Sequence, residues 1–270
     1  MRLLRLACVA ATAALAAGCL QANTLVKVKT DGSGTIEQTV FISQQAMGMM
    51  GAMAKMGEQK EDMPAPNDFF SEAKFREAAT RLGPGVKFVS MQPLTSEGMQ
   101  GVKAIYAFTD ITQVRVDQGQ SVPGMPGQET QTSGRQPITF QLRKQASGAA
   151  MTITMPEPGP GSQQDEAPPK QAQQVPPEMM GMMQMLLKGM KVKVAVEVAG
   201  KILKTDAAHH TDNTVTLFEV DMDTLMQDPA MLQTLQGKLR PGASPQELQA
   251  ALSGMKGVKF SGPVVNVAWK

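Results

Sequence analysis

The sequence predicts an α+β fold, in which an antiparallel sheet of about six to eight strands carries amphipathic, methionine-rich helices packed on one face. Three observations predict this fold. Many segments alternate apolar and polar residues with a period of two, which is typical of strands with one face on a core and one in water. Other segments begin and end with helix-capping residues. Finally, methionines gather in two segments with helical spacing.

The predicted strands are spread along the chain after residue 24. Their polar outer faces favour an antiparallel sheet, because parallel strands are usually apolar on both faces. The apolar residues that share one face in each segment are Val26 and Val28; Ile36, Val40 and Ile42; Ala104, Tyr106 and Phe108; Ile138, Phe140 and Leu142; Met151, Ile153 and Met155; Val192, Val194, Val196 and Val198; Val215 and Leu217; and Val265, Val267 and Trp269.

A glycine-containing turn separates the first two predicted strands. The segment Asp31-Gly32-Ser33-Gly34 could suggest a calcium loop, but the further carboxylates that calcium requires do not follow it. We therefore expect a hairpin turn, with glycine where a positive φ is needed.

Three helices are predicted from their ends. The first is capped by Asn67 or Asp68 and runs to Leu82, before Gly83-Pro84. The second covers 228–237 and begins with an Asp-Pro pair. The third covers 244–254 and begins with a Ser-Pro-Gln-Glu capping box.

The methionines are the least usual feature, because 22 of them stand against nine Phe, one Tyr and one Trp. We expect two helices here. Their shared faces would hold Met49, Met53 and Met56 in the first, and Met179, Met180, Met182, Met183, Leu186, Leu187 and Met190 in the second.

Three interpretations of these helices stay open. They could fill a closed core, or line an adaptable groove for a lipid or another hydrophobe, since thioether side chains repack easily. The third interpretation is Cu(I) binding by soft sulfur ligands, namely Met179, Met182 and Met183, with His209 or His210. A helical stripe disperses sulfur atoms along its axis, which argues against that third interpretation.

The N-terminus has the layout of an export signal. Arg2 and Arg5 precede an uncharged apolar run that is too short to span a bilayer, and the run ends at Gly18-Cys19. The segment Leu15-Ala-Ala-Gly-Cys19 resembles the lipobox of bacterial lipoproteins, with Ala16 where that family usually has leucine. The resemblance implies cleavage before Cys19 and a lipid on its sulfur. Because Leu20 is not aspartate, it also implies sorting to the outer membrane, facing the periplasm.

These features divide the chain into parts. We expect a signal peptide over 1–18, a lipidated anchor and short tether over 19–23, and one α+β domain over 24–270. Two stretches rich in Gly, Pro and Gln, 117–136 and 156–177, are expected to be flexible loops.

The first predicted hairpin also resembles a known domain. Residues 24–43, with the sequence Val26-Lys-Val-Lys-Thr-Asp-Gly-Ser-Gly-Thr-Ile36 at their centre, are similar to the start of the LppM-type lipoprotein domain. That resemblance implies an α+β domain with a lipid-binding cavity. It brings no catalytic residues with it.

Charge and cysteine content exclude several functions. The chain has 26 Lys+Arg and 24 Asp+Glu, so loss of Arg2 and Arg5 leaves 24 of each. A mature chain without net charge or a basic run is a poor partner for nucleic acid. Cys8 would leave with the signal and Cys19 would carry lipid, so neither a disulfide nor a catalytic thiol is expected.

The remaining candidate residues favour structural roles. His209 and His210 are adjacent and would point to opposite faces of a strand, so we expect a solvated turn. Asp221 and Asp223 could bind magnesium, but Asp223 stands where a helix cap is wanted before Thr224.

The predicted function follows from these observations. Since the sequence contains neither a nucleophile elbow nor a phosphate-binding loop, we expect a non-enzymatic envelope lipoprotein without a cofactor. It would bind a hydrophobe or an envelope protein. A copper-handling lipoprotein is the alternative, and an envelope hydrolase is a more distant one.

Overall fold

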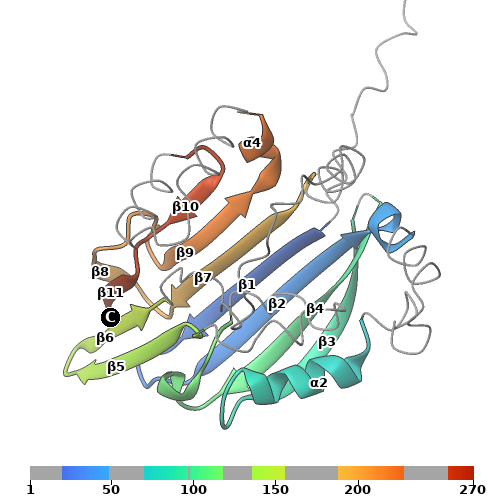
Figure 1. The fold of residues 1–270 in the computed structure, drawn as a ribbon. Coiled ribbons are helices and arrows are strands. Elements are labelled where there is room, and N and C mark those ends of the chain that lie inside the picture. The colour runs from blue at the N-terminus through green and yellow to red at the C-terminus, as the bar shows by residue number, and fades with distance from the viewer. Residues whose placement is uncertain (1–19, 49–69, 97, 118–135, 156–187, 228–254) are drawn as a thin grey trace, which may run out of the picture.

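The computed structural model describes residues 20–48, 70–96, 98–117, 136–155, 188–227 and 255–270. Most of them form strands, arranged in two sheets (Figure 1). The larger sheet has seven strands in the order β10-β9-β7-β1-β2-β4-β3. Their bounds are β1 Leu20–Val28, β2 Gly34–Ser43, β3 Lys87–Ser96, β4 Met99–Phe108, β7 Lys191–Val198, β9 Thr214–Asp221 and β10 Val258–Phe260.

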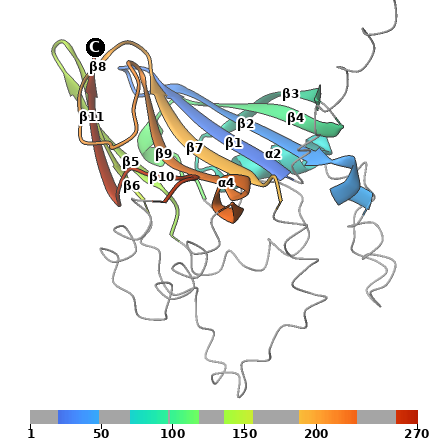
Figure 2. The same ribbon diagram turned by 90° about the horizontal axis from the view of Figure 1, so that it is seen from above.

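The smaller sheet has four strands in the order β5-β6-β11-β8, and it lies on one flank of the larger sheet (Figure 2). Its strands are β5 Thr139–Gln145, β6 Gly148–Thr154, β8 Ile202–Thr205 and β11 Val264–Trp269. The prediction of one sheet with six to eight strands therefore describes the larger sheet only. The second sheet was missed because the sequence pattern assigns strands but not the sheet that each one joins.

Most neighbouring strands are antiparallel, as predicted, but β1 and β7 run parallel. Because β1 is central, the late strands β7, β9 and β10 extend the sheet on the side away from β2. The sequence did not indicate this parallel pairing, because both strands have a polar outer face, which is typical of antiparallel strands.

The main core lies between the inner face of the larger sheet, the smaller sheet and α2 (Glu72–Arg81). The predicted strand faces are confirmed, because Val26, Ile36, Tyr106, Ile153 and Trp269 are almost fully buried in this core. In β7, the consecutive residues Val194 and Ala195 are both buried. They lie beside a register shift at which Leu217 of β9 has no partner on β7.

The helix predicted from Asn67 or Asp68 to Leu82 is present as α2, although the N-cap is Ser71. It ends at Leu82 before Gly83, whose φ is +127°, as the Gly-Pro signal indicates. Phe75, Ala78 and Ala79 form its buried face.

The other helical segments are short. Ile111–Gln113 forms a 3₁₀ turn, and α4 covers Met222–Met226. Residues 44–48 are helical at the start of the first methionine-rich segment. The predicted helices over 228–237 and 244–254, and the predicted loops within 118–135 and 156–177, lie outside the described residues.

The predicted hairpin turn between β1 and β2 is confirmed. Asp31 Oδ1 accepts hydrogen bonds from the Ser33 amide at 2.9 Å and from the Ser33 hydroxyl at 2.7 Å. Gly32 has a φ of +89°, and a Cβ on Gly34 would lie 1.9 Å from the carbonyl oxygen of Lys27. Both glycines are therefore required by the backbone of the turn.

Two edge strands, β3 and β8, contain a bulge and were not predicted. At each bulge one residue has no partner on the neighbouring strand, and its apolar side chain is exposed, namely Val89 (56%) and Leu203 (57%). Bulges interrupt a clean period of two, which explains why the pattern failed there. They also make an edge a poor template for pairing with another chain.

Candidate hydrophobe-binding face

An unbroken row of apolar residues crosses the inner face of the larger sheet. Strand registers place the members directly opposite one another, so they all share one face. From one side of the sheet to the other, the row consists of Val258, Val220, Val192, Ala22, Val40 and Val102. We call this set the apolar row.

Two small clusters extend the apolar row toward the end of the sheet where β1 begins. On one side, Ala46 and Met47 pack with Ala22, Val40 and Ile42. On the other, Leu225 and Met255 pack with Val258. Val192 is half-buried between the two clusters. The inner face therefore stays apolar beyond the region that the smaller sheet covers.

The next row of the sheet is interrupted by two polar residues. Thr24 and Gln38 stand directly opposite each other, and they are 2% and 5% exposed. Their neighbours in the row are Val194 and Ala104. The polar pair thus separates Ala22 and Val40 from the main core, to which Val102 at the end of the row belongs. Phe70 packs against both clusters.

The side chain of Gln38 carries a buried acceptor that is not used. Its Oε1 atom has no hydrogen-bond partner among the described residues. A buried carbonyl oxygen without a donor costs about 1–3 kcal/mol of stability. Such an atom, bordered by apolar side chains, is suited to accept a hydrogen bond from the polar group of an amphipathic ligand.

Two further buried polar atoms lack a partner, but they lie in the main core. These are the Tyr106 hydroxyl and the Trp269 Nε1 atom. The ring of Tyr106 packs edge to face against Phe88 at a centroid distance of 5.9 Å, and burial raises the pKa of its hydroxyl. Both side chains are enclosed by the two sheets, so we assign them to packing.

The opposite face of the larger sheet carries ion pairs instead. Glu37 on β2 bonds both Lys27 on β1 and Lys103 on β4, each at 2.7 Å. Burial alone would raise the pKa of Glu37, but the hydrogen bonds from Lys103 and Lys27 outweigh it and lower that pKa. The hydrogen bond between Lys27 and Glu37 also raises the pKa of Lys27.

A second set of ion pairs lies on β7, β9 and β10. Glu219 bonds Lys259 at 2.8 Å and lies 3.6 Å from Lys193, while Asp221 bonds Lys191 at 2.8 Å. Despite the opposing effect of burial, these lysines lower the pKa of Glu219 and of Asp221. The outer face of the larger sheet is therefore charged, whereas its inner face is apolar.

Most of the methionines predicted to bind a hydrophobe lie outside the described residues, as do Leu186 and Leu187. Met190 is described and is half-buried just before β7. Five other described methionines are buried, namely Met47, Met99, Met151, Met155 and Met255. Whether the predicted methionine stripes line a groove therefore stays a prediction.

Gln38 and Thr24 were missed at the sequence level, although a signal existed. The apolar series on β2 runs Ile36, Val40, Ile42 and omits position 38, and the series on β1 could have been traced back through Thr24 to Ala22. A gap in a period-two series places a polar residue on the buried face.

The two histidines occupy a surface turn near β8. His210 is exposed and its Nδ1 lies 3.0 Å from the carbonyl oxygen of Ala207, while His209 is half-buried. His210 borders a polar hollow of about 490 Å³ with Lys204 and Asp212. In the part of the chain that the structure describes, no group of three or more His, Cys, Asp or Glu side chains could hold a metal.

The carboxylates near α4 have structural roles, with one correction. The N-cap of α4 is Asp221, which accepts a hydrogen bond from the Thr224 amide at 3.3 Å, and not Asp223 as predicted. The strand extends to Asp221, so the helix begins two residues earlier. Asp223 instead accepts a hydrogen bond from the Gly189 amide at 2.6 Å.

Comparison with known proteins assigns no family to this chain. No family model matches it, and no curated protein does. A solved NMR structure, the folded domain of the Mycobacterium tuberculosis LppM protein, is 9% identical, with a TM-score of 0.31. The match covers 76% of this chain and 84% of that chain. At this level of similarity, neither fold nor function is transferred.

Within the described ranges, no helix is long and apolar enough to cross a bilayer.

Proposed function

We propose that this chain is a lipid-anchored lipoprotein of the bacterial cell envelope that binds a hydrophobic or amphipathic molecule without chemical turnover. The anchor would be a lipid on Cys19, in the outer membrane and facing the periplasm. The binding surface would be the apolar row together with Gln38. This proposal places the ligand on the inner face of the larger sheet.

A single observation carries this proposal. An apolar row spanning six strands borders a buried carbonyl oxygen that has no donor. Apolar surface with a few placed polar groups is the usual composition of small-molecule sites. The charged outer face offers no comparable surface among the described strands.

Native mass spectrometry of the exported chain would test the proposal. The variant Cys19→Ser lacks the sulfur that is acylated. Exported behind the cleavable signal peptide of a secreted protein, it can be purified without detergent. We expect it to carry a small hydrophobic molecule that organic solvent extracts. Protein that retains no ligand, and takes up none from lipid extracts of its host, would contradict the proposal.

A matched pair of variants would locate the ligand. Val192→Thr keeps the shape of a half-buried side chain but places a hydroxyl within the apolar row. We expect it to reduce ligand occupancy. Val264→Thr makes the same change at a 47% exposed position on β11, outside the apolar row, and should leave occupancy unchanged.

A further inference from the structure

β1 begins immediately after the proposed anchor residue. Its first residue is Leu20, so residues 20–23 belong to the strand and not to a tether. Strand registers place Leu20 opposite Ile42, and Gln21 beside Lys191. We call this end of the larger sheet the Leu20 end. Its described residues are Leu20 and Gln21, 44–48, 188–191, α4 and 255–257.

Backbone hydrogen bonds hold the parts of the Leu20 end together. The Met222 amide donates to the carbonyl oxygen of Met190 at 3.0 Å, and the Asp221 amide donates to that of Gly257 at 2.7 Å. The Leu20 end is therefore a continuous surface formed by β1, β2, β7, β9 and the segments that adjoin them.

We propose that the Leu20 end is the surface with which the folded chain rests on the bilayer. This inference rests on the proposed function, since it requires a lipid on Cys19. Consecutive Cα atoms are about 3.8 Å apart, and a strand rises about 3.3 Å per residue. The polar layer of one leaflet is about 5–8 Å thick. Leu20 and Gln21 therefore lie among the lipid headgroups, together with their neighbours on β2 and β7.

The composition of the Leu20 end fits such a contact. Lys188 and Lys256 are exposed, and neither forms an ion pair with another described residue, so we assign both to anionic headgroups. Leu20, Met222 and Met226 are half-buried and present apolar surface beside them.

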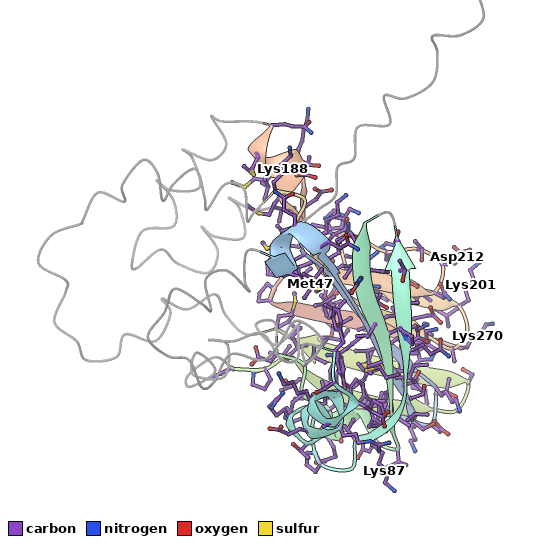
Figure 3. All side chains as sticks on the ribbon, turned by 90° about the vertical axis from the view of Figure 1, so that its right-hand side faces the viewer. Met47, Lys87, Lys188, Lys201, Asp212 and Lys270 are labelled. Carbon is purple, nitrogen blue, oxygen red and sulfur yellow. The ribbon has the colours of Figure 1, made fainter. Side chains whose placement is uncertain are left out.

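Charge alone would not select this end. Lys87 and Lys201 are exposed at the opposite end, where the Ala199 amide donates to the carbonyl oxygen of Val28 at 2.8 Å. Figure 3 shows Lys188 at one extreme of the molecule and Lys87 at the other. The covalent position of the anchor distinguishes the two ends, because Cys19 adjoins Leu20, and Leu20 is eight strand steps away from Val28. At about 3.3 Å per step, the opposite end lies roughly 26 Å farther from the bilayer.

Single-cysteine labelling of the full acylated chain would test this orientation. Cys8 leaves with the signal and Cys19 carries lipid, so an introduced cysteine would be the only free thiol. Lys188→Cys and Gln44→Cys place an environment-sensitive dye at the Leu20 end. Lys87→Cys and Lys201→Cys are matched controls, since all four positions are exposed. The chains are reconstituted in phosphatidylethanolamine–phosphatidylglycerol vesicles that contain a lipid with a nitroxide on its headgroup.

We expect the nitroxide to quench most of the fluorescence at positions 188 and 44 and to leave positions 87 and 201 unchanged. Quenching at 87 or 201 as strong as at 188, on chains that are acylated and float with vesicles, would overturn the orientation but leave ligand binding intact. Chains without lipid on Cys19, shown by the mass of the N-terminal peptide, would overturn both the anchor and the orientation.

Discussion

Replacing Gln38 by methionine should make the protein more stable, although the change lies in its interior. Methionine has nearly the same length and shape, so packing is preserved, while the carbonyl oxygen without a donor is removed. Since that oxygen costs about 1–3 kcal/mol, we expect a gain of about 1 kcal/mol after incomplete repacking. For a chain of this size, that gain raises Tm by about 2–4 °C.

Chemical denaturation of the Cys19→Ser chain, with and without Gln38→Met, measures this difference. The control is Gln100→Met on β4, which lies opposite Ile42 but is exposed. It should change stability by less than about 0.5 kcal/mol. Destabilisation by Gln38→Met of about 1 kcal/mol or more would mean that the amide has a donor in the free protein, and the reasoning would fail.

The same variant should bind ligands less selectively. 1-Dodecanol can donate a hydrogen bond to Gln38 Oε1, whereas dodecyl methyl ether cannot. A neutral hydrogen bond of about 1 kcal/mol corresponds to about fivefold tighter binding of the alcohol. We expect this preference in the parent chain and its loss in Gln38→Met. Equal affinities for both compounds in the parent chain would remove Gln38 from the site but leave hydrophobe binding in place.

Three further predictions concern the fold. The pKa of Glu37 is lower in the folded protein than its unfolded value of about 4.3. Its charged form therefore stabilises the protein fully at pH values above about 4.3, and this stabilisation is lost as the pH falls through the folded-state pKa. Glu37→Gln should therefore cost about 1 kcal/mol at pH 7 and weaken the pH dependence of acid unfolding; an unchanged acid transition would contradict this. Gly34→Ala should cost at least about 3 kcal/mol in urea unfolding, because its Cβ meets the Lys27 carbonyl oxygen, while Gly48→Ala meets no atom within 4 Å and should be close to neutral. Phe75→Ala should cost about 3–5 kcal/mol, since this fully buried ring joins α2 to the core; a loss below about 1 kcal/mol would show that α2 does not hold the sheet.

The period-two pattern predicted which residues face the core but not how the strands are joined. Ile36 and Tyr106 were placed correctly because one-sided burial fixes a strand's register with respect to its core. The parallel pairing of β1 with β7 depends on contacts between residues about 170 positions apart, and no local pattern encodes them. The bulge at Leu203 removed the alternation on which strand prediction depends.

The candidate site was predictable only in part, for a related reason. Apolar residues such as Val40 and Val192 were assigned to one face of their strands, but their alignment into a row follows from inter-strand register. Gln38 was visible only as a gap in an apolar series. Its significance depends on the absence of a hydrogen-bond donor, which is a property of the folded structure.

The position of the apolar row would link the proposed ligand binding to the proposed anchor. Its member on β1, Ala22, stands three residues after Cys19, which is about 10 Å along a strand. If the Leu20 end rests on the bilayer, the apolar row lies just above the headgroup layer, and Gln38 lies about two strand steps farther out, opposite Thr24. An amphiphile that left the bilayer would then reach the buried apolar row first and the unpaired carbonyl oxygen of Gln38 second. The acyl chain would therefore be buried against apolar side chains before the polar group of the ligand forms its hydrogen bond with Gln38.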